Sequence, residues 1–474
     1  MNQKAQDIVV AGAGITGLMI ALQLTKTHPG SRISVFDRAA EVGGMYASVK
    51  YPNGQVFDHG MHVIYESCTP AIDDLYREVM PPQDWHILEQ NEKDIAGLFF
   101  RGKLQSYSHY VDLRSFPEGQ QRDFAASIMR AVATPRPEAI ESCGDFLEAQ
   151  FGPEVVNAVH DQVLDSLYGI PASEASMQAV RLTALERVIL FDAPTMLDLM
   201  KADKIRSRLG FPDQLNLPPY RANTQKALYP KQFGMGHFVD RLKQLLLSRG
   251  VALHTSTSLA QIHRAGERID GVTLSAEGEA DERLPVDALV WTVGWPTLAR
   301  SLGVSLQGLA PPPSGRTKLA IANLVFDRAP AMDRLYYFYC YDTGFATFRV
   351  TNYSNYCPAA SADGTFPVGV ELWPARLGAG SEKLTDDELV ALAVDELRKF
   401  GVIDDHRLLF GAIHRGGGEF PVPSLQADRQ LREVRERVRA VLPENVIVAG
   451  IQAEPGLFFV PDILNDAFTK MAHL

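Results

Sequence analysis

Three glycines near the N-terminus have the spacing at which backbone amides hold a dinucleotide. They lie in Gly12-Ala-Gly14-Ile-Thr-Gly17, directly after the β-branched run Asp7–Ala11. The first glycine permits a tight turn, the second lets the backbone approach a pyrophosphate, and the third lets a helix pack close to a strand. We expect a helix over Leu18–Lys26 whose N-terminus faces the phosphates.

A second apolar segment, Arg32–Phe36, ends at Asp37, twenty residues after Gly17. An acidic side chain at this position binds a ribose hydroxyl in dinucleotide-binding units. The glycine motif alone is a weak signal, and Asp37 alone is more often a solvated loop residue. Strand, glycines, helix, second strand and acid in this order predict a Rossmann-type unit.

Two further motifs distinguish between NAD and FAD. The chain continues with Arg38-Ala-Ala-Glu-Val-Gly-Gly-Met45 and later Phe57-Asp-His-Gly-Met-His62. The first resembles the D/E-R-x-x-x-x-G-G motif of FAD enzymes of the amine oxidase, protoporphyrinogen oxidase and UDP-galactopyranose mutase superfamily. The second resembles the superfamily segment that brings a histidine near the isoalloxazine ring, with Met61 where many relatives carry glycine. The alternatives are an ordinary turn at the glycine pair and a core histidine at His62.

The middle of the chain, from about 67 to 226, shows helical periodicity and resembles the helical substrate-side insertion of the superfamily. The stretch Phe151–Pro171 is similar to a segment that usually reads K-x-W-G. Here Ser166 replaces the lysine and Tyr168 replaces the tryptophan, so no substrate contact is transferred. A helix that ends at Gly169 explains the same pattern.

The segment Tyr229–Gly236, followed by an amphipathic helix over His237–Arg249, is similar to the superfamily's Y-P-K-G-G-M-G element. In relatives the next strand holds the adenine of FAD through its main chain, which implies Leu259 at this place. Asp287–Thr292 is expected to be a buried strand of the dinucleotide domain.

Aromatic and polar residues alternate in Tyr336–Tyr339, Phe348–Val350 and Tyr353–Tyr356, as in a sheet with one face toward a pocket. The guanidinium of Arg349 suits phosphate or carboxylate. Tyrosines that cap a core with exposed hydroxyls are the alternative. We take Arg349, with Tyr353, Asn355 and His62, as the candidate catalytic residues.

Near the C-terminus, Glu444–Gly450 reads as a strand and Ile463–His473 as a helix. The resemblance implies that the N-terminus of this helix faces the flavin pyrimidine ring, where it favours negative charge. Ile451 follows the glycine where relatives commonly carry arginine, and Arg38 and Arg415 are the candidate replacements.

The predicted fold class is α/β: a Rossmann-type FAD-binding domain with an interleaved mixed-sheet and helical substrate domain. The FAD-binding parts are 1–66, 227–298 and 416–474, the helical part is 67–226, and the sheet part is 299–415. The candidate cofactor-binding residues are Gly12, Gly14, Ile15, Thr16, Gly17, Asp37, Arg38, Gly43, Gly44, Met45, Gly60, Met61, His62, Leu259, Gly450, Asp462 and Ile463.

Composition narrows the function further. The 474 residues are 46% hydrophobic and 22% charged, with a net charge of −11, which argues against nucleic-acid and membrane-surface partners. Four cysteines without a CxxC pair predict neither a disulfide framework nor a metal site.

Glycines, a threonine and a glutamine interrupt the apolar run Ile8–Leu24, so we expect neither a signal peptide nor a membrane span there. We expect a cytoplasmic protein that is a monomer or a homodimer. Pro311–Gly315 is the clearest linker.

Three functions follow from the resemblance. The first is an oxidoreductase with non-covalent FAD, since no counterpart of the flavin-tethering cysteine is found, acting on a small polar metabolite such as a sugar nucleotide or a secondary-metabolite intermediate. The second is a redox-neutral pyranose–furanose mutase of a nucleotide sugar, in which N5 of reduced FAD is the nucleophile. The third is a flavin-binding protein without turnover. An anionic or polyhydroxylated small molecule is the expected substrate in the first two.

Overall fold

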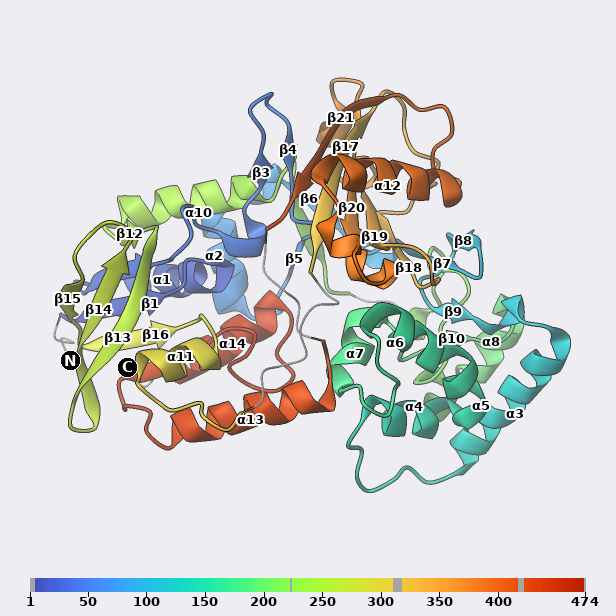
Figure 1. Ribbon diagram of the computed structural model, residues 1–474, viewed down its shortest axis with the longest axis horizontal. Coiled ribbons are helices and arrows are strands. Elements are labelled where there is room, and N and C mark those ends of the chain that lie inside the picture. Colours follow the sequence, from blue (N-terminus) through green and yellow to red (C-terminus); the bar gives the residue numbers. More distant parts are fainter. Residues whose placement is uncertain (1–4, 222–223, 310–317, 417–421, 473–474) are drawn as a thin grey trace. The chain divides into compact units, whose positions relative to one another are not determined.

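The computed structural model describes residues 5–221, 224–309, 318–416 and 422–472 (Figure 1). The expected linker Pro311–Gly315 lies outside them. Contacts divide the chain into two units: unit 1 comprises 1–87, 225–310 and 430–474, and unit 2 comprises 88–224 and 311–429. The chain first passes from unit 1 to unit 2 after Ile87. The reason is that the segment after 66 contributes a helix and a strand that pack within unit 1.

Unit 1 is built around a parallel five-stranded sheet with the order β12-β2-β1-β16-β22. These strands are β1 (Asp7–Ala11), β2 (Arg32–Phe36), β12 (Ala252–His254), β16 (Ala288–Trp291) and β22 (Val446–Val448). They are short and rich in β-branched residues, as strands covered on both faces should be. The fold class predicted from the sequence is confirmed.

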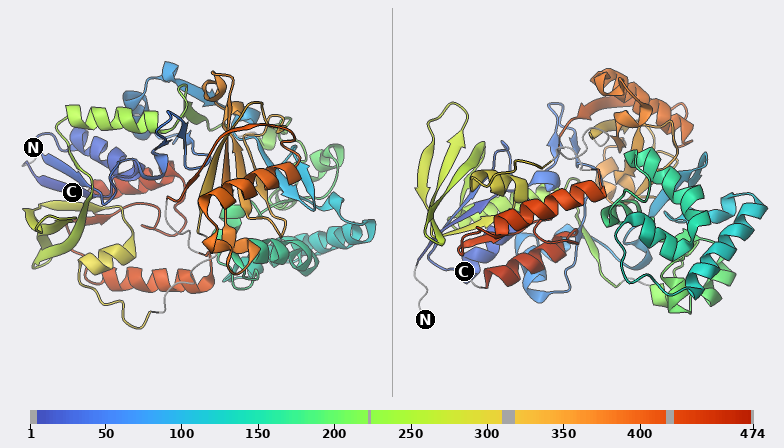
Figure 2. Two further views of the ribbon diagram at one scale, coloured as in Figure 1. Left: turned by 45° about the horizontal axis from the view of Figure 1, so that its top comes forward. Right: turned by 60° about the horizontal axis from the view of Figure 1, so that its bottom comes forward.

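Helices cover one face of this sheet (Figures 1 and 2). Helix α1 packs against three others on that face. The four are α1 (Ile15–Thr27), α2 (Pro70–Val79), α10 (Gly236–Ser248) and α14 (Val460–Met471). Val10 of β1 points toward α1, where only the hydrogen of Gly17 separates helix from strand.

The other face packs on a three-stranded antiparallel sheet, β13-β14-β15. Val9, Ala11 and Phe36 form one buried cluster with this sheet and with helices α11 and α13, because alternate strand residues point to opposite faces. These elements are β13 (Thr257–Ala265), β14 (Arg268–Ala276), β15 (Glu282–Pro285), α11 (Trp295–Ser301) and α13 (Leu425–Arg439). A small sheet, β5-β11-β6, completes unit 1 with β5 (Ile64–Tyr65), β11 (Ala227–Pro230) and β6 (Trp85–Leu88).

Unit 2 contains a seven-stranded mixed sheet with the order β21-β17-β20-β19-β18-β7-β8, in which only β18 and β7 run parallel. Helix α12 (Asp386–Lys399) packs on β17 and β21. The strands are β7 (Ala96–Phe100), β8 (Lys103–Gln105), β17 (Ala320–Phe326), β18 (Tyr337–Cys340), β19 (Thr347–Asn352), β20 (Phe366–Leu372) and β21 (Leu408–His414).

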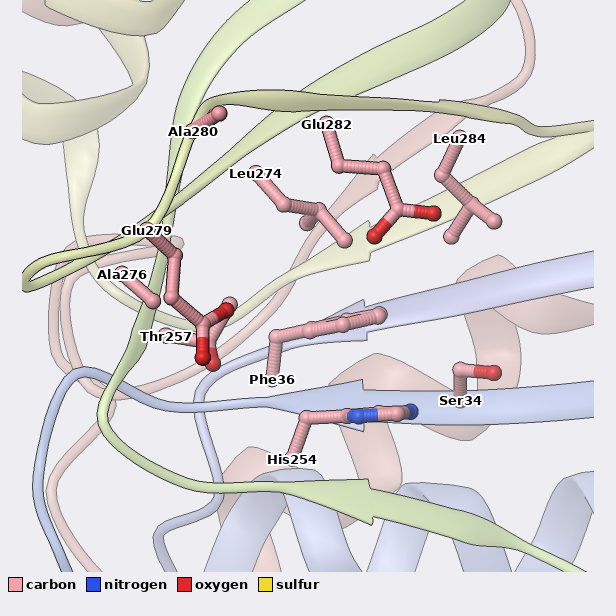
Figure 3. A pocket seen from close by; sticks show the side chains of 10 residues that line it. All are labelled: Ser34, Phe36, His254, Thr257, Leu274, Ala276, Glu279, Ala280, Glu282 and Leu284. Atoms are coloured by element: carbon pink, nitrogen blue, oxygen red, sulfur yellow. The ribbon is translucent and has the colours of Figure 1, made fainter.

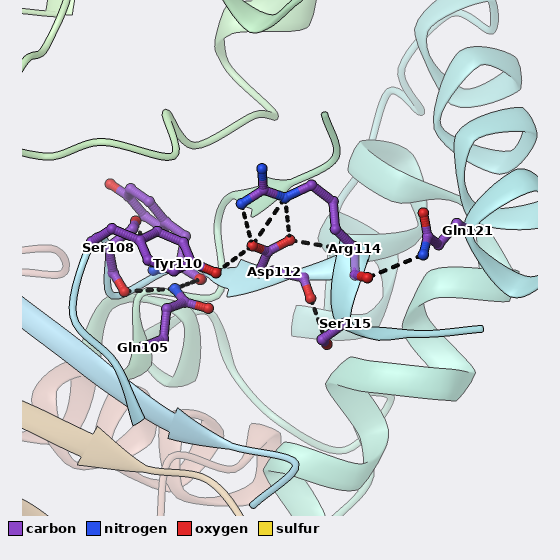
Figure 4. A network of polar contacts seen from close by, with 8 residues as sticks. Gln105, Ser108, Tyr110, Asp112, Arg114, Ser115 and Gln121 are labelled. Atoms are coloured by element: carbon purple, nitrogen blue, oxygen red, sulfur yellow. Dashed lines mark hydrogen bonds and ion pairs between the residues drawn. The ribbon is translucent and has the colours of Figure 1, made fainter. Parts of the chain in front are cut away.

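The helical part of unit 2 has its own core, in which Leu147, Phe151 and Leu164 are fully buried. Its helices are α3 (Glu118–Ala133), α4 (Cys143–Phe151), α5 (Pro153–Val155), α6 (Asp161–Tyr168), α7 (Met177–Thr183), α8 (Ala193–Leu199) and α9 (Asp203–Arg206). Strand β9 (Val111–Asp112) pairs with β10 (Val188–Ile189) beside them. A polar network leads from β9 into α3: the Asp112 carboxylate accepts from Arg114, and Gln121 Nε2 donates to the Arg114 carbonyl at 3.0 Å (Figure 4).

Candidate functional site

The first and third glycines of the loop after β1 are required by the fold itself. Gly12 has φ +102°, and a Cβ there would lie 2.3 Å from Oγ1 of Thr292. A Cβ on Gly17 would lie 1.9 Å from the carbonyl oxygen of Gly12. Both distances are far below contact, so larger residues at either position would displace the loop.

Gly14 differs from both. Its backbone is extended (φ −66°, ψ 172°), and a Cβ there would meet nothing within 4 Å. Gly14 is also the N-cap of α1, and its lack of a side chain leaves the first amides of the helix, around Ile15 and Thr16, without a side-chain cap. A cradle that a Cβ would fill, next to an uncapped helix N-terminus, fits a diphosphate.

The second glycine pair packs directly on this loop. Gly43 N donates to the Ala13 carbonyl at 2.7 Å, and Gly43 pairs with Gly14 in a parallel bridge. A Cβ on Gly44 would lie 3.3 Å from Cα of Gly14. Met45 follows in the 3₁₀ turn Gly44–Tyr46 and is half-buried. The two motifs identified in the sequence therefore form one surface.

The Asp37 carboxylate braces the loop. Oδ2 accepts from Ala13 N at 2.7 Å, and Oδ1 accepts from Ala39 N at 2.8 Å. Each oxygen keeps further lone pairs, so a ribose hydroxyl could still bind. Arg38 is exposed beside it. Leu259 lies in β13 with its side chain buried, and its carbonyl accepts from Ser301 Oγ at 3.1 Å.

A buried carboxylate, Asp58, connects the histidine segment with the start of α10. It accepts from Tyr229 Oη at 2.6 Å, from Met235 N at 2.8 Å and from Ser48 Oγ at 3.0 Å. Desolvation raises the pKa of Asp58 to about 6, although these three hydrogen bonds act in the opposite direction. Asp58 was not among the candidate residues predicted from the sequence. Its place in the segment Phe57–His62 was the available signal, but only Gly60, Met61 and His62 of that segment were taken as candidates.

His62 lies at the end of this segment. Gly60 has φ +87°, a value that favours glycine, and the half-buried Met61 follows it. The His62 ring is half-buried, with Nδ1 3.5 Å from the Gly60 carbonyl oxygen and an edge-on contact of 5.4 Å to the Tyr46 ring. His62 therefore lies in the same unit as the glycine loop.

The C-terminal turn meets the glycine loop through Thr292. Gly450 has φ +100°, and a Cβ there would lie 3.1 Å from the Thr292 carbonyl oxygen. Helix α14 begins at Val460, three residues before the predicted start, because Pro461 suits its first turn. Asp462 is therefore an exposed acid in the first turn, and Ile463 is buried beneath it.

Ile451, at the position after Gly450, is 54% exposed. Of the two proposed substitutes for the missing arginine, Arg38 is exposed after β2 and Arg415 pairs with Asp386 in unit 2. Instead, Arg435 of α13 donates to the Gln452 carbonyl at 3.3 Å. Arg435 could not be predicted from the motif around Gly450, because it lies upstream of the strand, on the neighbouring helix.

In unit 2, Arg349 Nε donates to Glu371 Oε1 at 2.6 Å, across the β19–β20 pair. The guanidinium also lies 5.6 Å from the Tyr337 ring centre and 6.0 Å from that of Tyr339. The Glu371 charge raises the pKa of Arg349, against the effect of burial. The pair is close to neutral, so Arg349 alone is not an open cationic site.

Tyr353 and Asn355 have structural contacts in unit 2. Tyr353 is fully buried, and its hydroxyl packs against Gly369, where a Cβ would lie 2.6 Å away. Nδ2 of Asn355 donates to the carbonyls of Asp333 and Leu335 at 2.9 and 2.8 Å. These contacts hold the turn that follows β19.

The altered K-x-W-G segment has partners that the sequence did not reveal. Ser166 Oγ accepts from Arg376 at 3.0 Å, and the Tyr168 ring lies 5.8 Å from that of Trp373. The guanidinium of Arg376, which is far from this segment in the sequence, thus contacts Ser166, the position where relatives carry lysine.

Comparisons with known proteins agree with this architecture. Residues 10–79 match the family model of an NAD(P)-binding Rossmann-like domain. The chain is 23% identical to coproporphyrinogen III oxidase of Staphylococcus aureus over 279 residues, which cover 54% of this chain and 55% of that protein. It is 23% identical to human protoporphyrinogen oxidase over 333 residues, 67% of this chain and 66% of that protein. The matches thus span about half to two thirds of these curated relatives.

A crystal structure of reduced UDP-galactopyranose mutase superposes with a TM-score of 0.74 at 17% identity, covering 99% of this chain and 95% of that one. Fold and site together define a dinucleotide-binding α/β protein with an interleaved second unit. These similarities agree with the resemblance to the FAD-dependent amine oxidase superfamily that the sequence motifs indicated. Within the described residues, no helix has both the length and the apolar character needed to cross a membrane.

Proposed function

We propose that this chain binds FAD non-covalently and is an oxidoreductase acting on a small polar metabolite. One observation carries the cofactor half of the proposal. Gly14 has room for a side chain but carries none, and it lies between two glycines that the fold requires. A backbone surface with open space in front of it suits a ligand that fills that space.

Residues around the glycine loop would each bind a different part of the cofactor. The amides at the start of α1 would bind the diphosphate, and the carboxylate of Asp37 would accept from a ribose hydroxyl while it braces Ala13. Bound FAD supplies an acceptor for two electrons and a proton from the substrate. The first turn of α14 adds a helix N-terminus, which stabilises negative charge.

The substrate half of the proposal rests on the sheet of unit 2. Arg349, Glu371 and Tyr339 form a polar group in which one cation meets one anion. A neutral pair of this kind suits a hydroxyl-bearing molecule, because it offers both donors and acceptors. It suits a nucleotide diphosphate less, since Glu371 already neutralises the arginine, and this weighs against the mutase alternative.

The test is the absorbance spectrum of the purified protein, followed by anaerobic incubation with a panel of amines, alcohols and sugar nucleotides. Bleaching of a yellow protein by one of these compounds is the expected result. A dithionite-reduced protein that isomerises a nucleotide sugar without net flavin oxidation would make it a mutase instead. A colourless protein that does not take up added FAD would refute both functions.

A further inference from the structure

A small cavity opens in unit 1 between the parallel sheet and the hairpin that joins β14 to β15 (Figure 3). Its volume is about 210 Å³, and its walls come from β2, β12, the three-stranded sheet and the hairpin. None of the lining residues belongs to the glycine loop or to the other candidate cofactor-binding residues. The cavity therefore shares no lining residue with the candidate cofactor site, although Thr257 N donates to the Asp37 carbonyl at 2.8 Å.

An aromatic ring forms the floor of this cavity. Phe36 is 3% exposed, and its ring stacks on that of His254 with centres 4.5 Å apart and an interplanar angle of 8°. In Figure 3 His254 lies under one side of Phe36, while Leu274 and Glu282 lie over the other. The face of Phe36 opposite His254 is thus turned toward the cavity.

Two carboxylates of the hairpin region, Glu279 and Glu282, line the same space. In Figure 3 both carboxylate groups are directed toward the floor. Both residues are exposed, and neither side chain has an ion-pair or hydrogen-bond partner among the described residues. Two unneutralised negative charges next to an aromatic face favour a cation and disfavour an anion.

The size and the walls define the ligand further. A cavity of about 150 Å³ is enough to hold benzene, so about 210 Å³ suits one ring with a small substituent. Leu274 and Leu284 provide apolar contact for the ring. A planar N–H group can bind a carboxylate through two parallel hydrogen bonds. We propose that this cavity binds a small planar organic cation, an amidinium, a guanidinium or a ring ammonium.

The probe for this site is benzamidinium, titrated into the purified full chain and followed by calorimetry. We expect one saturable site, and we expect the neutral isostere benzamide to bind at least about tenfold more weakly, because a hydrogen bond to a charged group contributes about 1.5–3 kcal/mol. The E279Q/E282Q double variant should weaken benzamidinium binding by at least about tenfold for the same reason. The substitutions are made at the two glutamates and not at Phe36. The Phe36 carbonyl accepts from the Gly12 amide at 2.8 Å, so a change at Phe36 would also disturb the glycine loop.

The matched control is E277Q, which removes the same charge from the same hairpin but lies outside the cavity. It should change the affinity by less than about twofold, since Glu277 does not line the cavity and solvent screens its charge. Equal weakening by E277Q, or equal binding of benzamide, would overturn the proposal. Flavin absorbance is recorded in the same titration, because release of FAD by benzamidinium would place the probe in the cofactor site and also overturn it. A protein without flavin that still binds the probe would refute only the proposed function.

Discussion

Tyr229 donates its hydroxyl hydrogen to Oδ2 of Asp58 at 2.6 Å, in the interior of unit 1. The two residues are 171 positions apart and belong to the two motifs that flank the helical insertion in the sequence. Gly234 N in turn donates to the Tyr229 oxygen at 3.1 Å, and Gly236 N donates to Ser48 Oγ at 2.8 Å. One buried carboxylate therefore organises the start of α10 and the segment that leads to His62.

The first prediction concerns this carboxylate and pH. Burial raises the pKa of Asp58 to about 6 in the folded chain, and an exposed aspartate has a pKa near 4. The folded state thus binds the proton more tightly, so the contribution of Asp58 stabilises the fold at low pH and is lost as pH rises through about 6. Relative to D58N, the free energy of unfolding of the wild type should fall by about 2–3 kcal/mol from pH 4 to pH 7.

Urea unfolding of both proteins across this pH range measures the difference. D240N, a change at an exposed carboxylate of α10, is the control and should keep the wild-type pH dependence. If D58N shows the same pH dependence as the wild type, Asp58 does not titrate as its burial requires.

The second prediction is that substitutions at two glycines of the loop have different effects on stability and on FAD retention. Gly14→Val should leave the free energy of unfolding within about 1 kcal/mol of wild type, since its backbone is extended and the space is open. It should nevertheless abolish FAD retention, because the side chain would occupy the diphosphate cradle. Gly17→Ala should destabilise the fold by about 3 kcal/mol or more, because its Cβ would overlap the Gly12 carbonyl. Thermal unfolding and flavin absorbance together measure both effects, and a yellow Gly14→Val protein at full occupancy would contradict the assignment.

The third prediction concerns Asp37. Its two carboxylate oxygens each accept a backbone N–H, but an asparagine retains only one acceptor oxygen. D37N should therefore raise the dissociation constant of FAD by about tenfold, which corresponds to one weakened hydrogen bond to a charged group. Flavin fluorescence titration gives the value, and D281N, at an exposed position before β15, is the control. An unchanged constant in D37N would remove Asp37 from the cofactor site.

The fourth prediction concerns the ion pair of unit 2. Glu371 is 5% exposed, so R349A should destabilise the protein by about 3 kcal/mol through the charge left unpaired. R349A with E371Q removes that charge and should recover most of the loss. Both variants should keep the flavin spectrum and bind substrate more weakly. Loss of flavin in R349A would instead assign Arg349 to the cofactor.

Local features of this chain could be predicted because they depend on neighbouring residues. The strand Asp7–Ala11, the glycine loop and Asp37 lie within one continuous segment, and their spacing follows from the geometry of one strand, one turn and one helix. The start of α14 was placed three residues too late, since sequence periodicity defines the body of a helix better than its end.

The sequence by itself thus determined the class of fold and the surface for a dinucleotide. Only the tertiary structure decided which distant segments meet: Glu371 beside Arg349, Arg435 at the Gln452 turn, Glu282 over Phe36, and Asp58 beneath Tyr229. The physical reason is that these pairs depend on strand order and register and on how helices pack, which are set by burial over the whole unit rather than by residues near in sequence. These contacts change the chemistry expected from the sequence. Glu371 neutralises the predicted cation Arg349, and the buried network of Asp58 positions the segment that leads to His62.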